Sequence, residues 1–367
     1  MLQDKYEVVT VSRGESPFDD VPHVQLPDAQ QRWGVVGRFL YLTALTLRTY
    51  PLITRVSAQD HAIREALGEQ EFDLVIAHDV QTAVVAEQQA PQEGVLVDLH
   101  EYAPRQNEHS RTWRWLIAPY FRWIIRGPVR RATATTTVSE GIVNEYATEF
   151  DLDPQLVINA SPFQDRKPTP VHTPLRLVHS GVAAPHRHLE ILIDAVLLTT
   201  AELTLDLYLV GADSDYGREL RMRASVDPRI RIHEPVAYEK LIPTLADHDI
   251  GVHILPPINF NHLHALPNKL FDYVQARLGV IIGPSPEMQR IVDQYEIGTV
   301  TVDFTPQALA EALNHLDPAD VTTWKSNSHT HAHELSSESQ VRVWREMVDD
   351  ILGEEKESPY DRVINAR

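Results

Sequence analysis

The sequence contains no cysteine and no long apolar run. Without cysteine there are no disulfides and no thiolate nucleophile, which fits a reducing compartment. The longest apolar candidate, Phe39–Leu47, lies between two arginines and is far shorter than the roughly 18–20 residues that span a bilayer. Met1–Tyr6 has no charged start followed by an apolar core, so no signal peptide is visible. We therefore expect a cytoplasmic protein.

Basic residues are scarce relative to acidic ones. The 33 lysines and arginines face 52 aspartates and glutamates, which gives a formal net charge of -19. Such a balance argues against general nucleic-acid binding. The chain also lacks a glycine-rich dinucleotide fingerprint, so any nucleotide it binds is held in another way.

What is present is an alternation of short apolar runs with helical patterns in both halves. This pattern predicts an α/β protein with parallel sheets and helices on both faces, and 367 residues favour two domains. The predicted strands are 6–11, 74–77, 95–99, 135–138, 175–179, 205–210, 230–233, 250–255, 280–282 and 299–302. We expect a first domain over 1–162, a linker rich in proline over 163–174 and a second domain over 175–335. A helix over 336–352 is expected to pack back on the first domain, before a charged tail over 353–367.

The most informative stretch is Leu266–Tyr273, which precedes the apolar run Leu278–Pro284. It places Asp272 on a short helix that leads into the core of an open sheet. Ligands of such sheets bind outside the carboxyl ends of the strands. A carboxylate there can accept hydrogen bonds from two ribose hydroxyls, which points to a nucleotide; the alternative is an ordinary carboxylate on a helix face.

Four segments together resemble the retaining, nucleotide-sugar-dependent glycosyltransferases of the group 1 (family 4) type. They are Val178–Gly181 with Arg187 and Leu189–Glu190, Leu207–Asp213, Leu266–Tyr273 with Pro286–Met288, and Val97–Glu101 with Thr137–Ile142. The resemblance is strongest from Leu175 to Leu313. It implies the GT-B fold, with two Rossmann-like, doubly wound domains that face a central cleft. It also implies transfer of a hexosyl unit from a UDP- or GDP-sugar to a polysaccharide or lipid-linked acceptor, with retention and without a metal or other cofactor.

On the donor side, the resemblance places five residues. Arg187 matches the family's loop cation for the diphosphate, and Gly181 allows close approach of the backbone to phosphate. Lys269 and the amides at the start of the helix at Asn268 add positive potential, and Asp272 takes the place of the ribose-binding Glu. A surface loop arginine and a turn glycine without ligand are the alternatives. Glu287 is expected to complement the start of its own helix.

Two histidines are the catalytic candidates. His264 stands where the family has the Glu that contacts the donor sugar, with His262 as its neighbour, and a polar loop is the alternative. His100 matches the family histidine near the anomeric carbon, and a structural hydrogen-bonding role is the alternative. We read His329, His331 and His333 as solvated, because their alternating spacing suits one metal ion poorly and no carboxylate framework accompanies them.

Some positions depart from the family pattern. Val182 replaces the arginine that follows the family's glycine, and the chain begins at what resembles the family's second strand, near Lys5–Val11. Either the sequence is short at its N-terminus or the domain is a reduced version. These departures favour a rival hypothesis, a catalytically silent GT-B subunit that binds a partner enzyme or a carbohydrate.

One segment of the first domain is basic in an acidic protein. Arg105–Arg131 carries seven arginines and a single acid, Glu108, interleaved with aromatic residues. Such a segment can lie on an anionic membrane surface, here the inner face of the membrane, and Arg32–Tyr41 can extend it. The alternative is a buried helix with snorkelling arginines.

Overall fold

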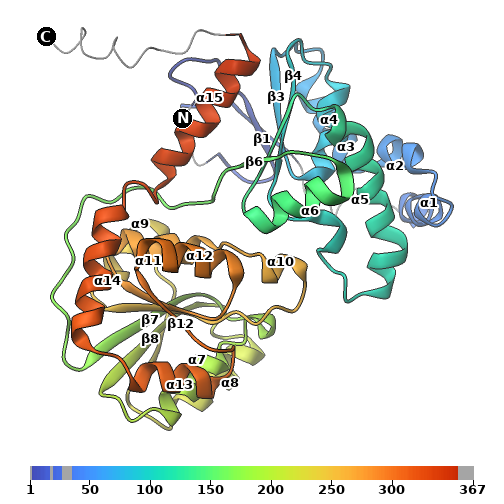
Figure 1. The fold of residues 1–367 in the computed structure, drawn as a ribbon. Coiled ribbons are helices and arrows are strands. Elements are labelled where there is room, and N and C mark those ends of the chain that lie inside the picture. The colour runs from blue at the N-terminus through green and yellow to red at the C-terminus, as the bar shows by residue number, and fades with distance from the viewer. Residues whose placement is uncertain (1, 17–19, 27–34, 354–367) are drawn as a thin grey trace, which may run out of the picture. The chain divides into compact units, whose positions relative to one another are not determined.

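The computed structural model describes residues 2–16, 20–26 and 35–353. By contact, the chain forms two compact units. One is Ile158–Gln340, and the other is Met1–Val157 together with the segment that starts at Val341. Each unit has its own parallel sheet with its own helices (Figure 1). No helix of the described residues is both long and apolar enough to cross a bilayer.

The first unit is built on a four-stranded parallel sheet in the order β3-β4-β5-β6. Its strands are β3 (Leu74–His78), β4 (Gly94–Leu99), β5 (Ala134–Thr137) and β6 (Gln155–Leu156). Its helices are α1 (Val35–Thr46), α2 (Tyr50–Val56), α3 (Ala58–Leu67), η2 (Val80–Thr82), α4 (Ala83–Gln88), η3 (Ala103–Arg105), η4 (Trp113–Ile117), α5 (Ala118–Ile124), η5 (Ile125–Val129) and α6 (Glu140–Phe150). Met347 and Val348 of α15 (Ser337–Ile351) pack against Leu96 of β4, so the C-terminal helix helps to form this core.

The strand predicted over 6–11 is wrong in extent. The structure has β1 at Thr10–Ser12, and it pairs in parallel with β2 at His23–Gln25 in a separate two-stranded sheet. The preceding residues turn to α15 instead, because Lys5 forms an ion pair with Asp349 at 3.1 Å and Tyr6 donates a hydrogen bond to the same carboxylate. The aromatic ring of Tyr6 also packs against this core.

The second unit has a six-stranded parallel sheet in the order β12-β11-β10-β7-β8-β9. Its strands are β7 (Leu175–Val182), β8 (Leu203–Val210), β9 (Ile230–His233), β10 (Ile250–His253), β11 (Gly279–Ile282) and β12 (Gly298–Val300). Its helices are η6 (Pro185–Arg187), α7 (Glu190–Leu198), α8 (Asp215–Ala224), α9 (Tyr238–Leu245), α10 (Phe260–Leu263), α11 (Asn268–Gln275), α12 (Pro286–Tyr295), α13 (Pro306–Asn314) and α14 (Pro318–His331).

Helices cover both faces of this second sheet. In Figure 1, α7, α8 and α13 lie on one face and α9, α11 and α12 on the other, in agreement with the two apolar clusters of the unit. The strands β10 and β11 are fully buried, which explains their continuous apolar sequence. The strand order reverses between β7 and β10, so this unit is doubly wound with its switch point there.

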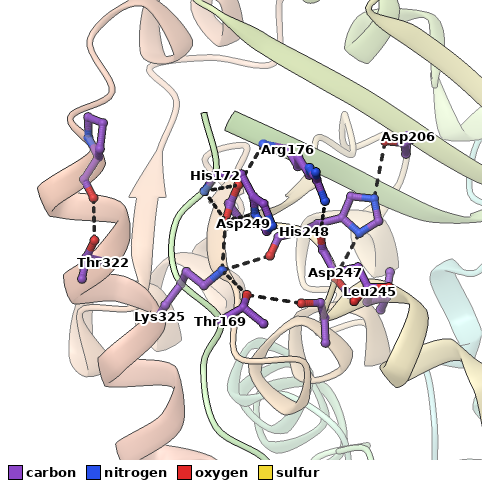
Figure 2. A network of polar contacts seen from close by, with 12 residues as sticks. Thr169, His172, Arg176, Asp206, Leu245, Asp247, His248, Asp249, Thr322 and Lys325 are labelled. Atoms are coloured by element: carbon purple, nitrogen blue, oxygen red, sulfur yellow. Dashed lines mark hydrogen bonds and ion pairs between the residues drawn. The ribbon is translucent and has the colours of Figure 1, made fainter. Parts of the chain in front are cut away.

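The predicted linker over 163–174 is not a free connector but is bonded to the second unit. The carboxylate of Asp249, fully buried before β10, accepts hydrogen bonds from the backbone amide of His172 at 3.3 Å and from its ring Nδ1 at 3.0 Å (Figure 2). Lys325 of α14 donates to Asp249 at 3.1 Å and to Thr169 at 3.0 Å. Two linker residues are therefore tied to the amino-terminal edge of the sheet through one buried ion pair.

Candidate functional site

The candidate site lies at the carboxyl edge of the second sheet, where the strand order reverses. Strand β7 contributes His179 and Gly181 near its end, and β10 ends at His253. The two strands are neighbours in the sheet. A switch point of this kind leaves a crevice outside the strand ends, and ligands of doubly wound sheets bind there.

Lys269 of α11 reaches over the backbone of β7. A Cβ atom built on Gly181 would lie 2.9 Å from Lys269 Cε, 3.2 Å from its Nζ and 3.3 Å from His179 Nε2. The glycine therefore makes room for the lysine side chain as well as for a ligand. Burial and the positive charge of Arg187 lower the pKa of Lys269, while Asp272 opposes that shift. Two cations thus meet beside the end of β7.

Asn268 and Arg187 flank this lysine. Asn268 is exposed as the first residue of α11, and no side chain caps that end of the helix, so its first amides face outward. Arg187 ends η6 and is half-buried. Its charge acts on Lys269 and lowers the pKa of the neighbouring His262 after the larger effect of burial. This set of donors suits a phosphate group.

Asp272 is buried one helical turn beyond Lys269. Its Oδ1 accepts a hydrogen bond of 2.5 Å from the hydroxyl of Ser161, a residue 111 positions earlier in the chain. Burial raises the pKa of Asp272, and the Ser161 hydrogen bond and the Lys269 charge oppose that shift. One carboxylate oxygen is thus fixed by the chain, which orients the group.

Two histidines of this site were not assigned a role from the sequence. His179 and His253 are both buried, with ring centroids 5.7 Å apart and ring planes within 9° of parallel. His179 Nδ1 lies 2.8 Å from the carbonyl oxygen of Val252. Burial, with the charges of Lys269 and Arg187, lowers the pKa of His179 to about 3, so the ring is neutral. The sequence did hold a signal for both histidines, because each is a polar residue inside a largely apolar predicted strand.

His264 follows α10 and is held by the start of α12. Its Nδ1 lies 3.1 Å from a carboxylate oxygen of Glu287, and its ring lies 4.6 Å from that of Phe260. Glu287 also accepts from Arg290 at 3.4 Å. Glu287 therefore fixes the orientation of His264, which is a structural role beyond the helix-end effect expected from the sequence.

His100 belongs to the first unit and forms a hydrogen-bonded trio with His78, the last residue of β3, and Asp98, near the end of β4. Its Nε2 lies 2.8 Å from Asp98 Oδ2, and His78 Nδ1 lies 3.0 Å from the same oxygen. Thr136 donates to Asp98 Oδ1 at 2.6 Å. The bond to Asp98 raises the pKa of His100. Burial alone would raise that of Asp98, but hydrogen bonds from His100, His78 and Thr136 lower it below its usual range.

The same trio is the one group of potential metal ligands found in the described part of the chain. Both oxygens of Asp98 already accept hydrogen bonds, so hydrogen bonding accounts for this geometry.

His329 and His331 lie in the last turn of α14, and His331 Nδ1 faces Glu334 at 3.3 Å. Beside His78 is a cavity of about 300 Å³, with Arg13, Gln59 and Thr82 among its lining residues.

The segment Arg105–Arg131 begins with a turn and continues as a helix from Arg111, with a buried face and several paired arginines. Ile124, Ile125 and Val129 are fully buried. Arg105, Arg122, Arg126, Arg130 and Arg131 each form an ion pair, with partners Glu108, Glu145, Glu149, Asp151 and Glu87. These contacts agree with the alternative, a buried helix with snorkelling arginines, and acidic side chains offset the charge of five of its seven arginines.

Comparison with known proteins adds a family and a fold. Residues 174–317 match the family described as Glycosyl transferases group 1, and no curated protein matches the sequence. The structure of Anabaena HepE in complex with UDP aligns with 94% of this chain and 100% of its own, at 14% identity and a TM-score of 0.67. Sucrose-phosphate synthase from Thermosynechococcus elongatus aligns with 96% of this chain and 90% of its own, at 14% identity and a TM-score of 0.68.

A third similar structure is larger than this chain. The pneumococcal O-GlcNAc transferase GtfA, in complex with UDP and GlcNAc, aligns over 79% of this chain at 16% identity and a TM-score of 0.58. The chain spans 59% of the length of that protein. Together these likenesses confirm the predicted fold, a GT-B arrangement of two Rossmann-like units.

Proposed function

Because residues 174–317 belong to the group 1 glycosyltransferases, we propose that this protein transfers a hexosyl unit from a nucleotide-diphosphate sugar, UDP- or GDP-linked, to a polysaccharide or lipid-linked acceptor. The observation that carries the proposal is the meeting of Lys269, Arg187 and the start of α11 at the switch point of the second sheet. Fixed positive charge at this edge matches a diphosphate, and the buried carboxylate of Asp272 matches a ribose diol.

The remaining residues have roles consistent with transfer. In the second unit, we assign His264, which Glu287 holds at 3.1 Å, to the donor sugar. In the first unit, we assign His100, which Asp98 holds at 2.8 Å, to the acceptor side of the reaction. Transfer proceeds with retention through an oxocarbenium-like state, in which the departing diphosphate accepts the acceptor's proton. The positive groups around Lys269 stabilise that leaving group as its charge grows, so no metal is required.

Relatives of known structure support the choice of donor class. HepE was solved with UDP and also with UDP and glucose, and GtfA with UDP and GlcNAc.

The rival function, a silent subunit that binds a partner or a carbohydrate, predicts no response to nucleotide-sugars. A thermal-shift screen of UDP- and GDP-sugars separates the two. A donor whose free concentration is one hundred times its Kd raises the free energy of unfolding by about 2.7 kcal/mol. A clear rise in Tm with one donor, lost in Asp272→Ala, supports the donor site on which transfer depends; no rise with any donor contradicts it.

For the lipid-linked acceptor we propose a docking surface on α1, α2 and η4 that is narrower than Arg105–Arg131. Phe39, Leu47 and Trp115 are each between 68% and 69% exposed, and η4 packs beside α1. The segment Val35–Val56 has three arginines and no acid in a chain of net charge -19. Exposed Arg111 and Arg114 adjoin Trp115. Within the described residues, no carboxylate pairs with Arg111 or Arg114, and apolar side chains beside such arginines match the anionic inner face of a membrane.

Vesicle co-sedimentation tests this surface. We expect binding to vesicles that contain phosphatidylglycerol, weaker binding to pure phosphatidylcholine, and at least a tenfold loss in Phe39→Glu with Leu47→Glu. Met222→Glu is the matched control, because Met222 is 70% exposed in the second unit. Unchanged sedimentation of the double variant would contradict the proposal.

A further inference from the structure

His253 is a buried polar side chain with no hydrogen-bond partner among the residues that the structure describes. Its exposure is 4%, and both ring nitrogens are unpaired in that part of the chain. A buried donor or acceptor left unpaired costs about 1–3 kcal/mol, so such a group in a folded protein calls for an explanation. His253 ends β10 at the switch point, which places it at the floor of the candidate site.

The charged side chains that most lower the pKa of His253, after burial, include Lys269 of α11 and Arg187 of η6. The ring also stacks on the neutral ring of His179 of β7, and His262 of α10 is a further imidazole that acts on it. No carboxylate is among these. Burial and these neighbours lower the pKa of His253 well below its ordinary value, so the ring is neutral without ligand.

We propose that His253 takes up a proton when the nucleotide-sugar binds, and that the resulting imidazolium donates a hydrogen bond to the diphosphate. The proton comes from solvent and attaches to one ring nitrogen, and no bond of the sugar changes in this step. The inference rests on the proposed function and names a residue of the same site.

The physical reason is a change in the sign of the local charge. A diphosphate bound by Lys269 and Arg187 brings negative charge to the two cations that now lower the pKa of the ring. A nearby opposite charge favours the protonated imidazole and raises its pKa. A charge-assisted hydrogen bond to phosphate then satisfies a nitrogen that is otherwise unpaired. Donor affinity should therefore fall as pH rises through the pKa of liganded His253, by up to about tenfold per pH unit.

Calorimetry measures the proton uptake directly. UDP-glucose and GDP-mannose are titrated separately at pH 6.5 in two buffers of different ionisation enthalpy, because their diphosphates are diesters with no proton to exchange near that pH. We expect an uptake of about half to one proton per site, lost in His253→Asn. His315→Asn, an exposed histidine of the same unit, is the matched control and should keep the uptake.

The outcomes separate this inference from the donor proposal. Binding without proton uptake, or uptake retained in His253→Asn, overturns the inference and leaves the donor site standing. Absence of binding by both sugars contradicts the donor site and this inference with it. If His253→Asn does not fold, ¹⁵N NMR of the wild-type imidazoles decides: one buried ring must shift from a neutral to an imidazolium signal on ligand addition, and rings that all stay neutral overturn the inference.

Discussion

Lys269 lies so close over Gly181 that a single methyl group at residue 181 would meet its side chain. The methyl carbon would lie 2.9 Å from Lys269 Cε. Since the obstacle is the far end of a flexible side chain, Gly181→Ala should fold normally but displace the ammonium. We expect Kd for the donor to rise about tenfold, or about 1.4 kcal/mol, with little change in Tm. Calorimetric titration measures the affinity. Gly14→Ala, with open space around it, is the control, and an unchanged Kd in Gly181→Ala would contradict this geometry.

Asp272 is expected to bind the ribose with one oxygen while Ser161 holds the other. Asp272→Asn removes the charge and keeps the shape, and hydrogen bonds to charged groups contribute about 1.5–3 kcal/mol. Donor affinity should therefore fall by roughly ten- to a hundredfold. Ser161→Ala, which removes only the 2.5 Å hydrogen bond, should lower affinity less. Equal losses in the two variants would mean that Asp272 acts only through its bond to Ser161.

His100 should titrate above its ordinary range because Asp98 accepts a hydrogen bond from its ring. Asp98→Asn should bring that pKa back toward about 6.5. A raised pKa in the folded state stabilises the protein below the unfolded value, and this contribution is lost as pH rises through the folded value. NMR titration of the His100 ring and denaturation at several pH values measure both effects. An identical pKa of His100 in Asp98→Asn and wild type would refute the coupling.

The buried pair of Asp249 and Lys325 should matter for stability rather than for ligand binding. Removing one partner of such a pair costs about 3–5 kcal/mol, because the other charge stays buried. We expect this loss in Asp249→Ala, and a much smaller loss when Lys325→Met is added. Burial alone would raise the pKa of Asp249. The net effect is a lowered pKa, because the carboxylate accepts hydrogen bonds from the Arg176 amide and from His172 and lies beside the charge of Lys325. The ionised Asp249 carboxylate therefore adds to the free energy of unfolding above about pH 3.9, and this stability is lost as the pH falls through the lower pKa of the folded state. Chemical denaturation provides the measurement, and a loss below 1 kcal/mol in Asp249→Ala would contradict it.

Transfer is expected to proceed without a metal ion. The described positive groups near the switch point are side chains and helix amides, which already compensate the charge of a diphosphate. Dialysis against EDTA should leave the initial transfer rate within twofold of the untreated enzyme. A rate restored only by added Mg²⁺ or Mn²⁺ would refute metal independence.

The sequence predicted most strands of the second unit because each contains several apolar residues in a short run. The runs at 205–210, 230–233 and 280–282 match β8, β9 and β11 closely. Strand β11 is apolar and buried throughout, whereas β8 and β9 interleave apolar with polar residues. The resemblance to group 1 glycosyltransferases is confirmed by the family match, and the GT-B fold by similar structures. Retention, the donor, the acceptor and every site residue remain predictions.

What the sequence could not predict depends on contacts between distant residues. The bond between Ser161 and Asp272 joins residues 111 positions apart, and the anchor of the linker joins His172 to Asp249 across 77 positions. His253 was overlooked because a strand pattern says nothing about whether a buried imidazole has a partner. The strand expected at 6–11 begins only at Thr10, because Lys5 and Tyr6 bond to Asp349. Asp349 lies more than 340 positions later in the chain, so the sequence gives no sign of this contact.

The most direct test is calorimetric titration of wild type and Lys269→Met with UDP-glucose and with GDP-mannose. Lys269 is the lysine of the proposed diphosphate site, and its side chain lies over Gly181. We predict saturable binding of at least one donor by the wild type, with affinity at least tenfold weaker in Lys269→Met and an unchanged Tm without ligand. Equal affinity of the two proteins, or no binding by either, would contradict a diphosphate site at the switch point of the second sheet.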